Sequence, residues 1–555
     1  MKATDLFVRC LEAEGVEYVF GVPGEENLDL LESLRGTSIE VIVTRHEQAA
    51  AFMAATYGRL TGKVGVCLST LGPGATNLVT GIAHAQLNGI PLLAITGQTG
   101  IRKNATADFQ VIDVVNMMRP ITKRTAQIQG PGSIPKEIRA AIKVATTERQ
   151  GACHLELPED VAAEELDDSA RPLPPGLIRR SEADPKAVRQ AAEKVRSAKL
   201  PIILVSSRGQ RNLVSKNLRL FADATGIHVI HTQLGKGVLG DDHPCSLFAF
   251  GIHRRDYVNY IVDRADLVIC VGYQTLEYPP SLWNPGVDRD ILNVDFVPAN
   301  TEVSFNPAVE LVGDISSSLA MLQEELDGYR SDNRQLVPFK LSLERKLFVD
   351  GSTNDSFPMR PRRIVRDVRH VLAPEDILCL DNGIYKLWFS RHFPTYQIGT
   401  FLIDNTLASM GAGLPTALAA KLVHPERRVL AVVGDGGFLM NSQEMETAVR
   451  LGLSVVVLLL NDDAFGFIKW KQRSMGFENY CMDLGNPDFQ RYAESYGARG
   501  FRVESADGLV PVLEEAFEGE GPALVECRID YSENTKIWSE ELDDLASGEG
   551  DTLVF

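Results

Sequence analysis

Two aspartates stand where they could bind a metal ion together with a phosphate group. Asp435 lies in a glycine turn, Gly434 to Gly437, that follows the apolar run Val429–Val433. Asp462 follows a second apolar run, Ser454–Leu460. Carboxylate oxygens are ligands that Mg²⁺ prefers, and the N–H groups of a glycine turn can approach an anion closely. Acidic residues at such positions often only cap the next helix, so the spacing alone favours metal binding and capping about equally.

The residues between the two aspartates predict a strand, a helix and a second strand. The spacing of Asn441 and Glu444 predicts an N-cap with a capping box at the start of the helix, and Gly452 predicts its end. A helix that joins two parallel strands makes a right-handed crossover, so both aspartates leave the carboxyl ends of neighbouring strands. Ligands bind at that edge of open α/β sheets.

Length and composition limit the classes of protein to which this chain can belong. Its 555 residues are too many for one core and indicate about three domains. The formal net charge of −18 argues against nucleic acid or an anionic membrane as partner. The eight cysteines lack metal-binding spacing, and most of them lie in apolar strand-like runs, which indicates buried thiols in a reducing compartment. No apolar run approaches the roughly 20 residues of a membrane span, so we expect a soluble cytoplasmic protein.

Strands and helices alternate along three stretches of the chain, which predicts an α/β fold with three doubly wound parallel-sheet domains. We expect these domains at residues 1–170, 185–330 and 360–535, followed by an acidic tail at residues 540–555. The predicted strands are Tyr18–Gly21, Ile39–Thr44, Val64–Ser69, Leu92–Thr96, His154–Leu157, Ile202–Ser206, His228–Thr232, Leu267–Gly272, Ile291–Asp295, Ile377–Leu380, Arg428–Gly434, Val455–Leu460 and Ala523–Arg528.

The turn at Asp435 also resembles a known motif. Gly-Asp-Gly, followed after a helix and a strand by Asn-Asp, is similar to the diphosphate motif of thiamine-diphosphate (ThDP) enzymes. In that family the first aspartate, the second residue of the later pair and a backbone carbonyl two residues further on are metal ligands. The resemblance makes Asp435, Asp462 and the carbonyl of Ala464 the expected Mg²⁺ ligands. Many members have asparagine where this chain has Asp462, so one more negative charge would face the metal.

Longer motifs resemble the acetolactate synthases and their relatives within the ThDP carboligase/decarboxylase superfamily. Val19–Gly24, Arg45–Ala50, Gly72–Asn77 and Asn88–Pro91 resemble the pyrimidine-binding domain, and Leu407–Pro415 resembles the diphosphate-binding domain. The resemblance implies that the first, second and third units are the pyrimidine-binding, central and diphosphate-binding domains.

The resemblance also implies a catalytic glutamate. In this family a glutamate hydrogen-bonds N1′ of the aminopyrimidine, and the cofactor serves as electron sink for a 2-oxo acid. Glu47, within the motif Arg45–Ala50, occupies that position. An acid at a helix N-terminus also suits the helix dipole, but the surrounding motifs favour catalysis. Gln110 is the candidate to contact the bound substrate.

Further residues are expected around the cofactor. Met410 and Phe467 are candidates to flank its rings, although such side chains more often belong to the core, and His46 and His84 are expected to be structural. The implied cofactor-binding residues are Gly24, Pro73, Asn77, Asn382, Gly383, Ile384, Tyr385, Ser409, Met410, Gly434, Asp435, Gly436, Gly437, Asp462, Ala464, Phe465, Gly466 and Phe467.

The central unit distinguishes FAD-binding biosynthetic synthases from FAD-free catabolic ones. FAD-binding relatives carry Gly-x-Gly after the first central strand, where this chain has Val-Ser-Ser-Arg-Gly at Val205–Gly209. The stretch Val271–Asn284 resembles the catabolic type, so we do not expect FAD. Gly235–Gly240 matches GxGxxG but leads into Asp241-Asp242 and not into a helix, so we predict a loop there.

Two departures from the family pattern concern the second substrate. Phe109 stands where catabolic relatives usually have histidine, and Lys471 where they have glutamine. A lysine at that position would suit an acidic acceptor, or it could equally point to solvent. These departures leave the acceptor open.

The resemblance implies an FAD-independent acetolactate synthase that decarboxylates pyruvate and joins the two-carbon unit to a second pyruvate. The alternatives are an enzyme for another 2-oxo acid, an FAD-dependent pyruvate oxidase, and a non-catalytic ThDP-fold protein. In the family each cofactor lies between two subunits. We therefore expect a homodimer or homotetramer in which Glu47 meets Asp435 across an interface.

Overall fold

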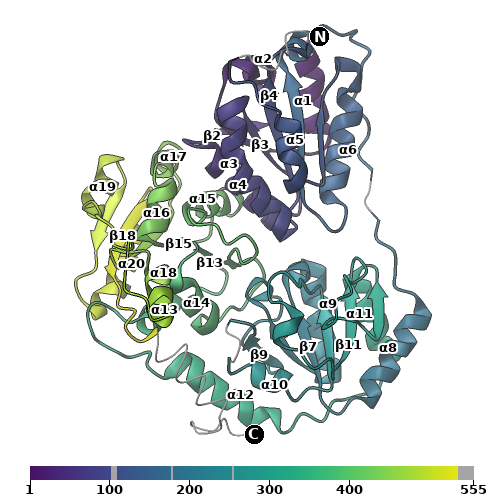
Figure 1. The fold of residues 1–555 in the computed structure, drawn as a ribbon, viewed down its shortest axis with the longest axis vertical. Coiled ribbons are helices and arrows are strands. Elements are labelled where there is room, and N and C mark those ends of the chain that lie inside the picture. The colour runs from purple at the N-terminus through teal and green to yellow at the C-terminus, as the bar shows by residue number, and fades with distance from the viewer. Residues whose placement is uncertain (102–108, 177–178, 253–255, 535–555) are drawn as a thin grey trace.

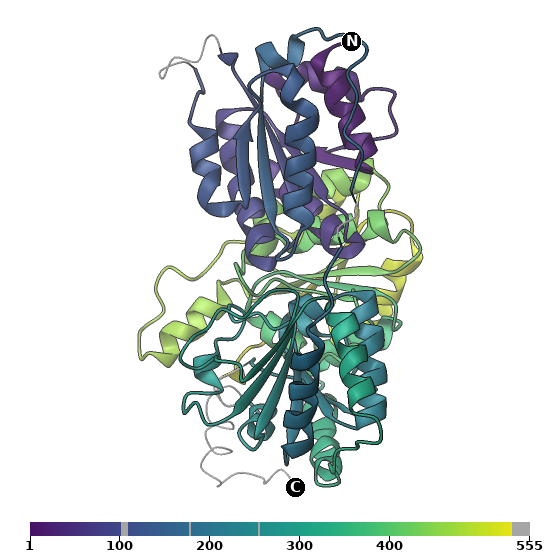
Figure 2. The same cartoon turned by 90° about the vertical axis from the view of Figure 1, so that its right-hand side faces the viewer.

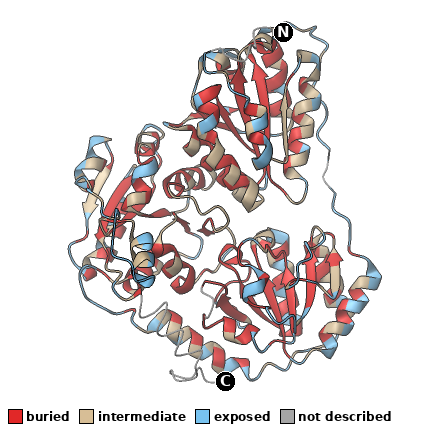
Figure 3. Cartoon of the chain, viewed as in Figure 1, coloured by how far each residue is buried: buried red, intermediate tan, exposed pale blue. Residues whose placement is uncertain are grey.

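Three six-stranded parallel sheets with packed helices form the protein (Figures 1 and 2), which confirms the predicted α/β fold. The computed structural model describes residues 1–101, 109–176, 179–252 and 256–534. The predicted acidic tail, residues 540–555, lies outside these ranges. The strands of the sheets are buried over most of their length (Figure 3), as expected of parallel sheets covered by helices.

The first sheet has the strand order β2-β1-β3-β4-β6-β5. Its strands are β1 (Tyr18–Gly21), β2 (Glu40–Val43), β3 (Gly65–Ser69), β4 (Leu92–Gln98), β5 (Arg124–Gln127) and β6 (Ala152–Pro158). The helices of this domain are α1 (Ala3–Ala13), α2 (Leu28–Leu34), α3 (Glu47–Thr61), α4 (Gly72–Asn88), α5 (Val114–Met118), α6 (Ile134–Thr146) and α7 (Glu159–Ala163).

The central sheet has the order β12-β11-β10-β7-β8-β9. Its strands are β7 (Pro201–Val205), β8 (His228–His231), β9 (Ser246–Ala249), β10 (Leu267–Val271), β11 (Asp290–Asp295) and β12 (Val309–Val312). The helices are α8 (Pro185–Ser197), α9 (Asn212–Thr225), α10 (Asn259–Val262) and α11 (Ile315–Glu325). After Gly235 the chain runs through turns and not into a helix, which confirms that the GxGxxG match is a loop.

The third sheet has the order β14-β13-β15-β16-β18-β17, which equals the order of the first sheet when strands are counted within each. Its strands are β13 (Ile377–Leu380), β14 (Phe401–Leu402), β15 (Val429–Gly434), β16 (Val456–Asn461), β17 (Arg499–Arg502) and β18 (Ala523–Arg528). The helices, including two that precede the first strand, are α12 (Leu336–Glu344), α13 (Pro361–Val371), α14 (Ile384–His392), α15 (Gly413–Val423), α16 (Asp435–Asn441), α17 (Glu444–Arg450), α18 (Gly466–Ser474), α19 (Phe489–Ser495) and α20 (Leu509–Glu518).

The predicted capping box at Asn441 is wrong. The helix begins directly at Asp435, and Asn441 is the last residue of α16. The Asn441 side-chain amide donates to the carbonyl of Gly411 at 2.7 Å and to Gln48 of the first domain at 3.0 Å. Glu444 begins the separate helix α17, and its carboxylate accepts N–H groups of the first domain. Gly452 does end that helix, with a φ of 61°.

The first and third domains share a buried apolar interface. Helix α3 packs against α15, and side chains of both helices belong to one hydrophobic cluster. The face of α3 is rich in alanine, which lets two helices approach closely. This packing fixes the start of α3, where Glu47 lies, against the third domain.

Candidate cofactor site

A cavity of about 600 Å³ lies between the carboxyl edge of the third sheet and the central domain. It gathers residues from separate strand ends, as the crossover argument predicts. Of the cofactor-binding residues predicted in the third domain, Ser409 alone is not in the cavity wall; its hydroxyl donates to the carbonyl of Met410 at 3.1 Å. The others line the cavity: Asn382, Gly383, Ile384, Tyr385, Met410, Gly434, Asp435, Gly436, Gly437, Asp462, Ala464, Phe465, Gly466 and Phe467.

Asp435 and Asp462 follow adjacent parallel strands, paired through Gly434 and Leu460. Asp435 is 1% exposed and accepts hydrogen bonds from the Asn486 amide at 2.7 Å and the Gly436 N–H at 3.0 Å. Burial raises the pKa of both carboxyls, and the charge of Asp435 helps to raise the pKa of Asp462 to about 7. Two carboxylates that repel each other in a partly buried cavity fit a divalent cation.

Asp435 and Asp462 supply only two carboxylates to such a cation. Within the described ranges, no group of three or more His, Cys, Asp or Glu side chains could hold a metal. The family resemblance implies that the backbone carbonyl of Ala464, a buried residue of the cavity wall, is a third protein ligand.

Backbone groups line the part of the cavity beside the two aspartates. Gly437 has no room for a side chain, since a Cβ there would lie 2.8 Å from Oδ2 of Asp381. Helix α14 begins at Ile384, next to the glycine turn, so its first N–H groups lie at the cavity wall. Helix N-termini and glycine turns bind phosphate groups through such N–H groups. The donor set therefore fits a diphosphate held together with a metal.

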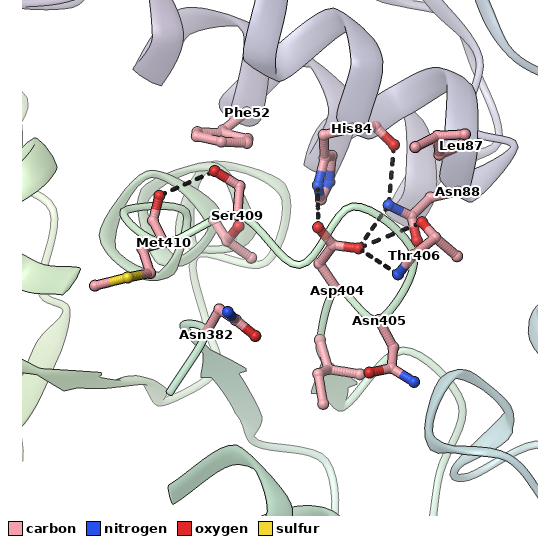
Figure 4. A network of polar contacts seen from close by, with 12 residues as sticks. Phe52, His84, Leu87, Asn88, Asn382, Asp404, Asn405, Thr406, Ser409 and Met410 are labelled. Carbon is pink, nitrogen blue, oxygen red and sulfur yellow. Dashed lines mark hydrogen bonds and ion pairs between the residues drawn. The ribbon is translucent and has the colours of Figure 1, made fainter. Parts of the chain in front are cut away.

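The loop that carries Met410 into the cavity is held by the first domain (Figure 4). The carboxylate of Asp404 lies 3.0 Å from Nδ1 of His84 and accepts the side-chain amide of Asn88 at 2.9 Å. It also accepts the N–H of Thr406 at 3.0 Å. His84 is thus a hydrogen-bonded residue at the domain contact, in line with the structural role expected for it.

The residues predicted in the first domain gather at the carboxyl edge of the first sheet. Glu47 begins α3, is 8% exposed, and accepts the side-chain amide of Asn77 at 3.0 Å. Gly24 and Gly74 pack against Thr70, at the end of β3. Pro73 lies at the start of α4.

Gln110 and Phe109 are exposed residues of the same domain. Gln110 has a φ of 62°, and its carbonyl packs against Gly72. The side chain of Phe109 is 84% exposed. Neither they nor Glu47 belong to the wall of the 600 Å³ cavity, whose described residues all come from the central and third domains. Within one chain, the predicted site residues therefore form two separate sets, one in the first domain and one in the wall of the cavity.

Sequence reasoning missed several residues of the cavity and its surroundings. Asn486 lies in a loop without a motif, so nothing in the sequence connects it to Asp435. Glu277 and Lys386 line the cavity as buried charged residues. Lys386 directly follows the predicted residue Tyr385. A lysine among the apolar residues of a helix is the sequence signal from which Lys386 could have been predicted. Lys471 is exposed and does not line the cavity.

Three domain models of thiamine pyrophosphate enzymes match the chain in the order of its sheets. The N-terminal TPP binding domain matches residues 1–117, the central domain residues 188–322, and the C-terminal TPP binding domain residues 381–527.

Full-length relatives agree with the domain matches. The chain is 33% identical to an acetolactate synthase of Bacillus subtilis, over 98% of this chain and 95% of that protein. It is 34% identical to a catabolic acetolactate synthase of Raoultella terrigena, over 96% and 95%. It is also 34% identical to a probable acetolactate synthase large subunit of Methanocaldococcus jannaschii, over 96% and 93%. The chain therefore belongs to the family of three-domain thiamine-diphosphate enzymes that includes the acetolactate synthases.

Proposed function

We propose that this protein is a ThDP- and Mg²⁺-dependent acetolactate synthase, a carboligase that decarboxylates pyruvate and transfers the two-carbon unit to a second pyruvate. The observation that carries the proposal is the cavity in which Asp435, Asp462 and the glycine turn meet the start of α14. The full-length similarity to acetolactate synthases of several organisms supports the choice of reaction.

Some residues of the chain would bind the cofactor, and Glu47 would take part in proton transfer. When bound, ThDP supplies an electron sink for decarboxylation of a 2-oxo acid. Asp435, Asp462 and the carbonyl of Ala464 would hold Mg²⁺, and the first N–H groups of α14 would hold the diphosphate. Glu47, fixed by Asn77, would hold a proton at N1′ of the aminopyrimidine.

A complete site in this proposal needs two copies of the chain. Glu47 and Gln110 lie apart from the wall of the cavity that contains Asp435. Because ThDP has a pyrimidine at one end and a diphosphate at the other, both sets of residues must face the same cofactor. A second copy that presents its first domain to the cavity would complete the site, in a homodimer or a homotetramer.

Features of the central domain support the proposal that this protein does not bind FAD. A second cavity, of about 520 Å³, lies among the three domains and is lined by Arg208 and Arg211. These cations are paired within the chain, Arg208 with Asp295 at 2.9 Å and Arg211 with Glu148 at 3.2 Å. This pairing lowers the positive charge that Arg208 and Arg211 would present to a flavin diphosphate. The main support for a protein without FAD is the sequence Val205–Gly209, which lacks the Gly-x-Gly of FAD-binding relatives.

Charge bears on the partners, and the cysteines bear on the location. With a net charge of −18, we propose an enzyme that binds neither nucleic acid nor an anionic membrane surface. Its free cysteines support a reducing compartment such as the cytoplasm. No helix among the described residues combines the length and apolar character that a bilayer span requires.

The purified protein with ThDP, Mg²⁺ and pyruvate, without added flavin, tests this function. The proposal predicts acetolactate and CO₂ in equal amounts, and no product when Mg²⁺ is chelated. CO₂ with free acetaldehyde would indicate a decarboxylase. CO₂ and a different acyloin product from another 2-oxo acid, with no turnover of pyruvate, would indicate a related carboligase and contradict the pyruvate assignment.

A further inference from the structure

The cavity contains one buried cation that the proposed reaction has not yet used. Lys386 is the third residue of α14, is 7% exposed, and lines the cavity. Opposite lie Gln233, Glu277 and Tyr278 of the central domain. Among the described residues of the cavity wall, Lys386 is the single lysine or arginine.

The ammonium of Lys386 is held by two neutral oxygens. Nζ donates to the backbone carbonyl of Asp404 at 3.2 Å and to the side-chain oxygen of Asn405 at 3.1 Å. An ammonium has three N–H donors, so one remains for a ligand. Burial lowers the pKa of Lys386 to about 8, against the opposing effect of nearby carboxylates.

The carboxylates near Lys386 are already engaged by other groups. Asp404 is bonded to His84 and Asn88, as shown in Figure 4. Glu277 accepts the hydroxyl of Ser206 at 2.8 Å and the N–H of Leu234 at 2.6 Å.

Asp381 is the third carboxylate whose charge raises the pKa of Lys386. It accepts hydrogen bonds from the N–H groups of Asn382 and Gly411 at 2.6 and 2.9 Å. None of the described residues forms a direct ion pair with the Lys386 ammonium. A buried charge is costly without a partner of opposite sign, so the arrangement favours a bound anion.

We propose that Lys386 binds the carboxylate of the 2-oxo acid substrate in this cavity. The inference rests on the proposed function and names the part of the substrate that this side chain recognises. The start of α14 and the two aspartates would hold the diphosphate and its metal. The Lys386 side chain is directed instead to Asp404 and Asn405, in the loop that carries Met410. A substrate carboxylate there would leave its reacting carbonyl toward the cofactor rings.

The family resemblance left open whether Lys471 contacts an acidic acceptor or points to solvent. Its side chain is exposed and outside the cavity wall. The substitution K471M therefore provides a matched control for K386M, because both remove one ammonium from a lysine of the third domain.

The test measures binding of oxamate, a carboxylate analogue of pyruvate, and of its neutral amide, oxamide. Titration calorimetry is carried out on the ThDP- and Mg²⁺-loaded protein. K386M is expected to weaken oxamate binding by at least about tenfold, as loss of a charged hydrogen bond does, and to leave oxamide binding unchanged. K386R retains a cation and is expected to recover most of the loss, whereas K471M is expected to bind oxamate as the wild type does.

Affinity for ThDP separates the proposed role from two others. If K386M leaves ThDP affinity within about threefold while oxamate binding falls, the cavity is intact and the carboxylate role stands. A loss of ThDP affinity without a selective loss of oxamate would assign Lys386 to the diphosphate and overturn the proposal. The proposal would also be overturned if wild type and K386M bound oxamate equally well, or if neither bound it.

Failure of this inference can be distinguished from failure of the proposed function. If wild type forms acetolactate and K386M does so with an unchanged KM for pyruvate, the reaction stands and the role of Lys386 is wrong. If wild type forms no acetolactate but oxamate binding still depends on Lys386, the carboxylate site stands and the assigned reaction is wrong.

Discussion

The two aspartates of the cavity differ in their surroundings, and this difference is informative about their roles. Asp435 is fully buried and receives two hydrogen bonds, whereas Asp462 is more accessible and stands where many relatives have asparagine. The sequence motif predicted both residues correctly as neighbours in one cavity. It could not predict Asn486, whose contact with Asp435 depends on how a later loop folds.

Replacing each aspartate by asparagine should therefore have unequal effects. Both carboxylate oxygens of Asp435 accept N–H groups, from Asn486 and Gly436. In D435N one of these oxygens becomes an NH₂ group, so two hydrogen-bond donors would face each other. We expect Mg²⁺-dependent ThDP affinity to fall about a hundredfold in D435N and less than about tenfold in D462N. Calorimetric titration of ThDP at fixed Mg²⁺ measures both. Equal losses in the two variants would contradict the separate roles assigned here.

At the scale of elements, the sequence predicted the central strands of every sheet but missed most edge strands. The missed strands are β5, β9, β12, β14 and β17, each at one edge of its sheet. Edge strands are short and carry polar side chains, as in Arg124–Gln127 and Arg499–Arg502. β5, β12 and β17 lack the continuous apolar run by which a buried parallel strand is recognised, and β14 has only two residues. The apolar and buried strand β9 was missed although it has such a run.

The contact of the first and third domains could not be predicted either. Glu444 resembles a capping residue in sequence, yet its carboxylate accepts the N–H groups of Arg45 and His46 at 3.1 Å. Only the packing of α3 on α15 brings these segments together. Local patterns describe an element and its ends, but not the surface against which it packs.

A buried histidine of the first sheet should make stability depend on pH. His154 of β6 is fully buried between the hydroxyls of Thr96 and Thr125, at 2.9 and 2.8 Å. Burial lowers its pKa from 6.5 to about 3 in the folded protein. The unfolded chain therefore binds a proton that the folded chain does not, and stability falls as pH drops below 6.5. At pH 5 the loss from this one group is about 2 kcal/mol.

Urea unfolding at pH 8 and pH 5 measures that loss. H154Q should lose less stability between the two pH values than wild type does, by about 2 kcal/mol. H370Q, which replaces an exposed histidine of α13, serves as the control and should behave as wild type. An unchanged pH dependence in H154Q would show that His154 is not held neutral in this way.

At the scale of the whole molecule, the first and third domains have the same strand order and each carries part of the predicted site at the carboxyl edge of its sheet. The sequence predicted the three sheets and both parts of the site. The family resemblance, and not the spacing of residues, implied that the two parts come from different subunits, and within one chain the two parts do not share a cavity. A complete site would therefore depend on how two chains combine.

Mixed dimers of E47Q and D435N test this dependence most directly. Each variant alone should be nearly inactive when ThDP is held near its wild-type Kd, since loss of the proton-holding carboxylate costs about 10²–10⁴-fold and D435N weakens Mg²⁺-dependent ThDP binding about a hundredfold. Co-expression with two different tags and purification on both yields dimers with one chain of each kind. If each site takes Glu47 from one chain and Asp435 from the other, one site is intact, and acetolactate formation should reach about half of wild type. Mixed dimers as inactive as either parent would mean that both residues of a site come from one chain, and would contradict the account.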